Sequence, residues 1–279
     1  MSKSKPSFYF LFILIVISAF NNPCSAQTDT LPSEKRSRMI LTFAVGMGLP
    51  IGEFAQFQQI PKYANYSEYN IAGEADAGIS GNLGFAYLFG KHFGIASSLN
   101  LSSFVSKQMT TQEIYSGGRH PFLIGVDETY ENGRWSAGGL MLGAIYECSK
   151  ENIRFGFRVL GGVQIASSPE TELEIASTNP DIIGDNLGIR NFHQPAMKST
   201  AFAYGGGAYF GYNLTDALSL NLSADFTSAN HTFNGKDMEV EYYEVYSGSS
   251  SDPRYSHAPL NFKKQISFVS LTLGVGYNF

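Results

Sequence analysis

The chain has 279 residues, of which 43% are hydrophobic, 14% aromatic and only 15% charged, with a formal net charge of −5. This acidic balance argues against nucleic-acid binding, which uses a basic surface. The two cysteines, Cys24 and Cys148, are too few for a disulfide framework. After the N-terminal segment there is no long unbroken apolar run, so we expect the chain either to fold in water or to cross a membrane as strands.

The N-terminus reads as an export signal. Lys3 and Lys5 precede an apolar run of about thirteen residues, 8–20, which is shorter than a membrane-spanning helix but typical of a signal peptide. Small residues then favour cleavage after Ala26. We predict a signal peptide over residues 1–26 and a flexible periplasmic tail over 27–38. The exported chain keeps 17 basic and 24 acidic residues, and Cys148 is its only cysteine, so no internal disulfide is possible.

Eight segments alternate large apolar residues with small or polar ones, which is the period of a strand with two different faces. They cover about residues 40–51, 77–89, 93–105, 135–148, 153–166, 200–212, 218–227 and 265–279. The second face carries Gly, Ser, Thr and Asn, which suits a crowded barrel interior with the apolar face toward lipid. We predict an all-β, eight-stranded antiparallel transmembrane β-barrel over residues 39–279, closed by pairing near Phe43 and Leu273. A soluble lipocalin-like barrel is the alternative, but the second face has almost no Lys or Glu.

The connections alternate between short and long. Three short turns, at 90–92, 149–152 and 213–217, alternate with four long loops, at 53–76, 106–134, 167–199 and 228–264. This indicates short periplasmic turns, long external loops and both termini on the periplasmic side. Two loop stretches, 170–175 and 239–245, alternate acidic with apolar residues, so we expect strands to continue above the membrane as hairpins.

The C-terminal strand Gln265–Phe279 ends on an aromatic residue, which resembles the end signal of bacterial outer-membrane barrels. Together with the signal peptide, the eight strands and the strand exit Gly48-Leu-Pro-Ile-Gly-Glu-Phe54, it makes the chain similar to the small eight-stranded outer-membrane β-barrels of Bacteroidota, described as outer membrane protein β-barrel domain or PorT-like. The resemblance implies a location in the outer membrane, contact with its lipid and lipopolysaccharide, and assembly by the barrel assembly machinery through Phe279. It implies no activity. We expect a monomer.

Motifs for catalysis are missing from the sequence. There is no Gly-x-Ser-x-Gly elbow, His-Glu-x-x-His, P-loop or dinucleotide fingerprint. Some outer-membrane barrels use a His and a Ser at the outer rim to modify lipid, and the deacylases carry the serine two residues after the histidine. His231 has Phe233 at that position. We therefore predict a non-enzymatic protein with no catalytic, cofactor-binding or metal-binding residue, and interpret His231 as a solvated loop histidine.

The external loops carry the remaining functional hypotheses. Their carboxylates are interpreted as solvated, with a divalent-cation site near the lipopolysaccharide headgroups as the alternative. Their tyrosines suit recognition or adhesion, or else pack together to order the loops. They are Tyr63, Tyr66, Tyr69, Tyr115, Tyr130, Tyr242, Tyr243, Tyr246 and Tyr255. The predicted function is display of loops for recognition, adhesion or envelope structure. The alternatives are an outer-rim lipid-modifying enzyme and a small-ligand-binding or transport barrel.

Two arginines are predicted to lie inside the barrel. Arg154 and Arg158 share the face opposite Phe155, and a charge left in lipid near the midplane would cost about 2–4 kcal/mol. If Cys148 pairs with Ile153, Glu147 faces Arg154 as an ion pair and Gly143 faces Arg158.

The next hairpin gives Arg158 a partner. If Tyr212 pairs with Leu218, Asp225 faces Gly205. We therefore predict a polar plug across the lumen formed by Arg158 and Asp225, with Gln164 and Asn221, since a buried charge needs a partner.

Overall fold

A computed structural model gives the fold and describes residues 39–56, 74–89, 91–107, 122–125, 133–177, 187–246, 249–250 and 254–279. For 107, 122–125 and the strand residues within 172–192 and 236–260, only the backbone is described. The predicted signal peptide and the tail at 27–38 lie outside the described residues. No helix in the part of the chain that the structure describes is long and apolar enough to cross a bilayer.

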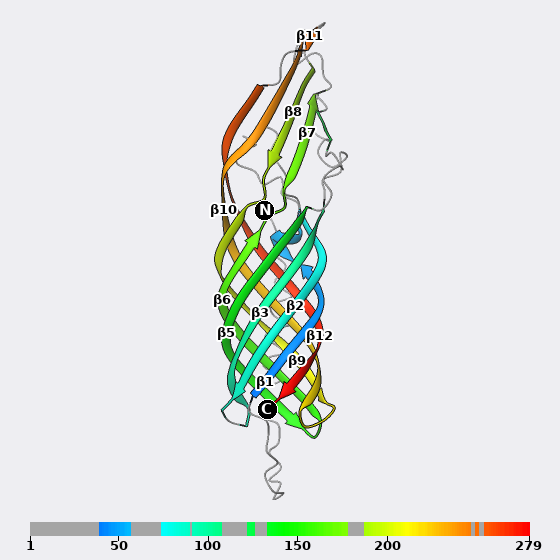
Figure 1. The fold of residues 1–279 in the computed structure, drawn as a ribbon, viewed down its shortest axis with the longest axis vertical. Helices are drawn as coiled ribbons and strands as arrows, with labels where there is room; N and C mark the ends of the chain where they lie inside the picture. The colour runs from blue at the N-terminus through cyan, green and yellow to red at the C-terminus, as the bar shows by residue number, and fades with distance from the viewer. Residues whose placement is uncertain are drawn as a thin grey trace, which may run out of the picture. The chain divides into compact units, whose positions relative to one another are not determined.

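Eight strands close into a ring in which every neighbouring pair is antiparallel (Figure 1). In ring order they are β1 (Met39–Pro50), β2 (Glu74–Leu88), β3 (Phe93–Lys107), β5 (Arg134–Lys150), β6 (Ile153–Ser167), β9 (Lys198–Asn213), β10 (Leu218–Tyr246) and β12 (Arg254–Asn278). β12 pairs with both β10 and β1, with Phe43 opposite Val275 and Val45 opposite Leu273. The predicted barrel and its closure are confirmed.

The short connections lie at one end of the barrel, which we call the short-turn end. They join β2 to β3, β5 to β6 and β9 to β10. The strand that closes the ring ends here too, since the Phe279 amide donates to the Met39 carbonyl at 3.0 Å. The opposite end is the long-loop end. The predicted alternation of short turns and long loops is confirmed.

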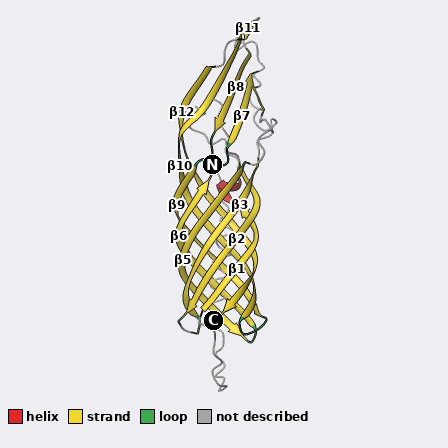
Figure 2. Cartoon of the chain, in the orientation of Figure 1, coloured by secondary structure: helices red, strands yellow, loops and turns green. Residues whose placement is uncertain are grey.

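A smaller sheet continues from the long-loop end. β10 and β12 remain paired beyond the ring as far as Tyr242 and Arg254, and further strands join β10 in the order β8 (Leu187–Gln194), β7 (Thr171–Ser177) and β4 (Phe122–Gly125). A short strand, β11 (Ser249–Ser250), also pairs with β10. We call these strands beyond the ring the extension sheet; Figure 2 shows it as strand rather than loop. The predicted continuation of a ring strand through 239–245 is confirmed. Residues 171–175 also form a hairpin strand, but it is the separate β7, which pairs with β8 and does not continue β6.

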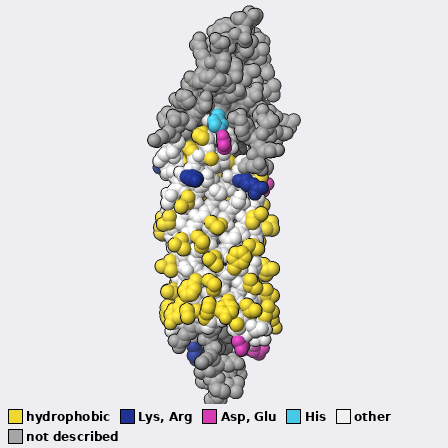
Figure 3. Space-filling model, in the orientation of Figure 1, with side chains coloured by type: hydrophobic (Ala, Val, Ile, Leu, Met, Phe, Trp, Pro, Cys, Tyr) yellow, Lys and Arg dark blue, Asp and Glu magenta, His cyan; other side chains and the backbone are white. Residues whose placement is uncertain are grey.

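The exterior of the barrel is apolar, whereas the interior holds both polar and apolar side chains. Phe43, Leu140, Val159, Phe202 and Leu273 are each 59–71% exposed. Figure 3 shows hydrophobic side chains over the visible barrel face and charged ones only toward its two ends. The opposite face of the same strands carries buried Ser, Asn, Thr and Ala. So wide an apolar surface is unfavourable in water and is the surface that lipid requires.

Candidate functional site in the lumen and the extension sheet

An ion pair crosses the lumen between two strands that are not neighbours. Arg158 on β6 and Asp225 on β10 both lie opposite Gly207 of β9. Arg158 Nε donates to Asp225 Oδ1 at 2.7 Å and Nη2 donates to Oδ2 at 2.6 Å. The side chains are only 12% and 13% exposed. A side chain at position 207 would contact the Asp225 carboxylate, so glycine is needed there. The predicted Arg158–Asp225 pair is confirmed.

Arg154 lies in a parallel row closer to the short-turn end. Its Nη1 donates to Asn278 Oδ1 at 3.0 Å and its Nη2 to Ser219 Oγ at 2.6 Å. A weaker contact of 3.4 Å joins Nη2 to Asn221 Oδ1. Arg154 is 5% exposed. This row therefore ties β6 to β10 and to the C-terminal strand at the short-turn end.

Glu147 does not form the predicted ion pair with Arg154. The turn between β5 and β6 has two residues, so Lys150 faces Ile153 and Ser149 faces Arg154. Glu147 instead faces Gly156 and accepts a hydrogen bond from the Tyr209 hydroxyl. An added Cβ at Gly156 would lie 2.5 Å from the Tyr209 ring, so the tyrosine crosses this glycine to reach Glu147.

The other predicted partners in the lumen also shift by two residues. Arg158 faces Ile145 rather than Gly143, and Asp225 faces Gly207 rather than Gly205 because Tyr212 pairs with Leu220 instead of Leu218. The two remaining members of the predicted plug bind elsewhere. Gln164 contacts His231, and Asn221 contacts Arg154.

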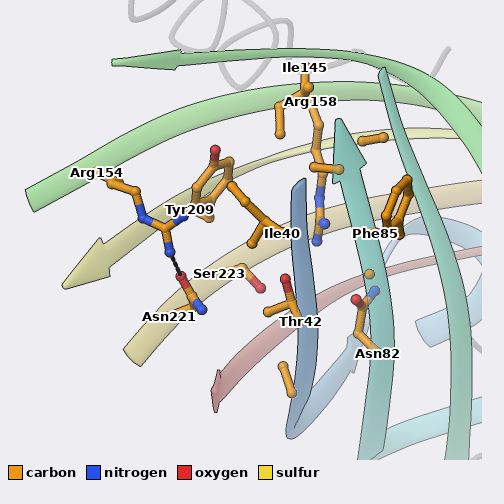
Figure 4. A pocket seen from close by; sticks show the side chains of 14 residues that line it. Ile40, Thr42, Asn82, Phe85, Ile145, Arg154, Arg158, Tyr209, Asn221 and Ser223 are labelled. Carbon is orange, nitrogen blue, oxygen red and sulfur yellow. Dashed lines mark hydrogen bonds between the residues drawn. The ribbon is translucent and has the colours of Figure 1, made fainter. Parts of the chain in front are cut away.

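A cavity of about 40 Å³ lies among these rows. Figure 4 shows Arg154, Arg158, Tyr209 and Asn221 around it, with Asn82 on the opposite wall. A cavity needs roughly 10–15 Å³ to hold a water molecule, so this one has room for a few waters and not for a solute. Farther along, hydroxyls link strands directly, with Ser80 Oγ 2.8 Å from Ser102 Oγ and 2.9 Å from Ser270 Oγ.

Aromatic side chains fill the lumen at the long-loop end. The 3₁₀ helix η1 (Gly52–Ala55) follows β1 and places Phe54 inside, 5.1 Å from the Phe104 ring and 5.5 Å from the Trp135 ring. The three side chains are 0% exposed. Phe233, Phe262 and Phe268 complete the set. We call these six residues the aromatic cap. Gly52 has φ of +62°, which permits the turn into η1.

His231 is not the solvated loop residue that the sequence suggested. β10 continues through this position, and His231 faces the lumen with 1% of its surface exposed. Its Nε2 lies 3.0 Å from Gln164 Oε1, and its ring packs 5.8 Å from Phe233. The histidine therefore belongs to the lumen beneath the aromatic cap.

Part of the predicted loop surface can be placed. Glu170 Oε1 lies 2.8 Å from His193 Nε2 on the exposed base of the extension sheet. Tyr63, Tyr66, Tyr69, Tyr115 and Tyr130 lie outside the described residues, and of the other loop tyrosines only the backbone is described. Among the side chains that the structure describes, no three His, Cys, Asp or Glu residues form a group that could hold a metal.

Comparisons with known proteins concern the fold alone. No family model and no curated protein sequence matches the chain. Solved structures similar to it include the attachment invasion locus protein Ail of Yersinia pestis (12% identity, TM-score 0.36, 87% of this chain and 97% of that one). Neisserial surface protein A has 9% identity and a TM-score of 0.40, over 86% and 97% of the two chains. The outer membrane protease OmpT from Escherichia coli has 10% identity and a TM-score of 0.36, over 90% and 99%. By its own closed ring of eight strands and its apolar exterior, the chain has the fold of a small transmembrane β-barrel.

Proposed function

We propose that the protein is a non-enzymatic, monomeric barrel of the outer membrane that presents the extension sheet outside the cell for recognition or adhesion. The observation that carries this proposal is the length of β10 and β12, which have 29 and 25 residues, against 12 to 17 in the other ring strands. The two long strands leave the barrel as a paired hairpin. A protein that only sealed or stiffened the membrane would not need that hairpin.

β10 continues far beyond the end of its lipid-facing surface. On β10 the outward residues are apolar from Leu218 to Phe226, and then Asn230 and Thr232 are exposed. The hairpin continues to Tyr242. At about 3.3 Å per residue, the sixteen residues after Phe226 are on the order of 50 Å of strand, more than the whole hydrocarbon core. In outer-membrane barrels the long connections are extracellular, which would place the extension sheet outside.

The contents of the lumen argue against transport. The Arg154 and Arg158 rows fill the half near the short-turn end, and the aromatic cap fills the other half. An eight-stranded barrel is only wide enough for its own side chains. The refolded protein should therefore show no steady conductance in a planar bilayer.

Location is tested by fractionation and by surface proteolysis. We expect the protein in the detergent-requiring outer-membrane fraction, and protease added to intact cells should cut the extension sheet but not the barrel. Recovery in the soluble periplasmic fraction would overturn the proposal.

Adhesion is tested with a shortened variant. The pairs Asn234–Asn261 and Phe233–Phe262 let β10 and β12 be joined by a tight turn after Asn234, without disturbing the aromatic cap. A non-adherent Gram-negative host displaying the full protein should bind epithelial cells or extracellular matrix, and the shortened variant should not. Equal binding by both would reject display by the extension sheet. A changed lipid A acyl pattern would instead support an outer-rim lipid-modifying enzyme.

We also propose that the barrel assembly machinery recognises Phe279 while the protein is inserted into the membrane. Its ring is 60% exposed and packs 4.7 Å from Tyr277 at the short-turn end. Deleting Phe279 should lower the amount of protein in the outer membrane while leaving the refolded barrel stable in detergent. Unchanged membrane levels would contradict this role.

A further inference from the structure

The aromatic cap is in contact with two buried basic side chains. His231 on β10 lies directly opposite Lys264 on β12. The two residues are 1% and 6% exposed. The His231 ring lies 5.8 Å from the Phe233 ring, and Lys264 Nζ lies 5.6 Å from the centroid of the Trp135 ring. Because directly opposed residues of antiparallel strands share one face, both basic side chains lie on the lumen side, against the cap.

The surroundings of His231 favour its neutral form. Its Nε2 donates to Gln164 Oε1 at 3.0 Å, because an amide oxygen can only accept. In the neutral ring Nδ1 is then an acceptor, and it is buried without a hydrogen-bond partner among the residues that the structure describes. The flanking residues Asn230 and Thr232 are exposed and polar, so this part of β10 lies beyond the lipid-facing surface. Burial here lowers the pKa of His231, although the Ser199 carbonyl on β9 favours the charged ring.

A charged His231 would meet a second cation. Lys264 lies on the adjacent strand, where directly opposed Cβ atoms are about 4.5–5.5 Å apart. Burial lowers the pKa of Lys264, while Glu53 in η1 and Glu74 on β2 favour its charged form. The contact from β6 is the uncharged Gln164. Protonation of the histidine would therefore place two buried cations side by side, and like charges at short range disfavour each other.

We propose that protonation of His231 loosens the aromatic cap, which makes the seal at the long-loop end of the lumen sensitive to pH. The charged ring repels Lys264, which shifts toward solvent and leaves the face of Trp135. A charged imidazole also needs polar partners that the apolar contact with Phe233 does not supply, and Phe233 stacks 4.8 Å from Phe262. This pH response of the lumen goes beyond the proposed display function and does not depend on it.

The lowered pKa of His231 sets the direction of the effect. A histidine in the unfolded chain titrates at about pH 6.5, and the buried ring titrates below that value. The contribution of the neutral ring to the closed cap is therefore fully present above about pH 6.5, and it is lost as the pH falls through the lower folded-state value. The cap should be closed at neutral pH and loosened in acid.

The test uses Trp135, the single tryptophan of the chain, as a reporter inside the cap. Acrylamide quenching of its fluorescence is measured on the refolded mature protein in detergent micelles, from about pH 8 to about pH 4, a range that covers histidine titration. Quenching should be low at neutral pH and should rise in one transition below about pH 6.5. Heat-modifiable migration on gels should show a folded barrel throughout, so that the transition reports the cap and not global unfolding.

Three variants assign the transition to its residues. His231→Gln removes the titrating ring but keeps a neutral polar side chain beside Gln164, so quenching should stay low over the whole range. Lys264→Met removes the second cation and should reduce the rise in quenching. The matched control is His193→Gln, which alters a histidine that is 35% exposed at the base of the extension sheet and should keep the full transition.

The proposal is overturned by quenching that does not change with pH, or by a rise that coincides with loss of the folded barrel. It is also overturned by a transition that persists in His231→Gln or, if that variant does not refold, in Lys264→Met. Loss of the transition in His193→Gln would assign it to the wrong histidine and would have the same consequence.

Discussion

The two halves of the barrel lumen are filled by different chemistry. The half near the short-turn end holds Arg154, Arg158 and Asp225 with Glu147 and Tyr209, joined by directed hydrogen bonds. The half near the long-loop end holds the aromatic cap, in which three ring pairs meet edge to face at 5.1 to 5.9 Å. Phe233 and Phe262 stack at 4.8 Å, and Phe104 and Phe268 meet tilted at 5.0 Å. The first half combines directed hydrogen bonds with buried apolar residues such as Ile40 and Ile145, and the second half is held by ring packing. Equal changes in side-chain size should therefore have unequal effects in the two halves.

Glycine explains how the polar half is built. Arg158 reaches Asp225 across Gly207, Tyr209 reaches Glu147 across Gly156, and Arg154 lies beside Gly211. In each row a strand contributes no side chain, so the strands on either side of it can be joined. The aromatic half has a parallel at Gly48, where an added Cβ would lie 2.8 Å from the Phe104 ring. There the glycine makes room for an aromatic ring rather than for a hydrogen bond between strands.

The largest effect is expected from removing one charge of the ion pair. Asp225→Ala leaves Arg158 buried without its carboxylate, and breaking a buried pair costs about 3–5 kcal/mol of unfolding free energy. Urea unfolding of the protein in lipid vesicles measures it. The double variant Arg158→Met with Asp225→Leu should recover most of the loss, because it removes both charges. A double variant as unstable as Asp225→Ala would show that the loss of stability does not come from the unpaired charge of Arg158.

A slightly smaller effect is expected from opening the aromatic cap. Phe54→Ala removes a fully buried ring, and such truncations cost about 3 kcal/mol where the site can partly collapse. The same variant should admit water from the long-loop end and raise the frequency of brief conductance events. Gln56→Ala, at the exposed residue that follows η1, is the control and should change neither quantity. A cap that tolerates Phe54→Ala without loss would mean that η1 is not part of the seal.

Overpacking a glycine row should cost less. Gly156→Ala forces the Tyr209 ring away from Glu147, and overpacking typically costs about 1–3 kcal/mol. Gly81→Ala is the control, since its added Cβ would meet nothing closer than 3.9 Å. Equal unfolding midpoints for the two variants would show that the space above Gly156 is not needed for the contact between Tyr209 and Glu147.

The smallest effect is expected from shortening the extension sheet. Joining β10 to β12 after Asn234 leaves the lumen contacts of both halves in place. The barrel should lose less than about 0.5 kcal/mol, the range of surface changes. Heat-modifiable migration on gels checks this. A large loss would show that the extension sheet supports the barrel rather than only being carried by it.

The sequence predicts the barrel well because lipid and lumen impose opposite demands on alternate residues. Alternation from Leu41 to Leu49 and from Val269 to Phe279 is enough to place two strands and their faces. The Arg158–Asp225 pair was also predictable, because a buried charge needs a partner and glycines beside both residues leave room for the contact. The acidic and apolar alternation at 239–245 likewise indicated a strand beyond the membrane.

Register and the cap were not predictable in the same way. The turn Glu151–Asn152 has φ of +51° at Glu151, which a two-residue turn requires but which its sequence does not announce. The sequence suggested a turn of four residues, and that register wrongly placed Glu147 opposite Arg154. Phe54 follows the Pro50 and Gly52 that end β1, so it read as part of a loop. Its burial depends on Phe104 and Trp135, which are distant in sequence.

The ion pair across Gly207 also acts as a check on assembly. Arg158 and Asp225 sit on β6 and β10, and they can meet only when β9 has paired correctly with both. A slip of two residues in either pairing keeps every apolar side chain toward lipid, so the membrane cannot detect it. It would, however, bury two charges without partners. The hydrophobic exterior therefore determines which face of each strand points toward lipid, and the buried ion pair determines the register of β6, β9 and β10.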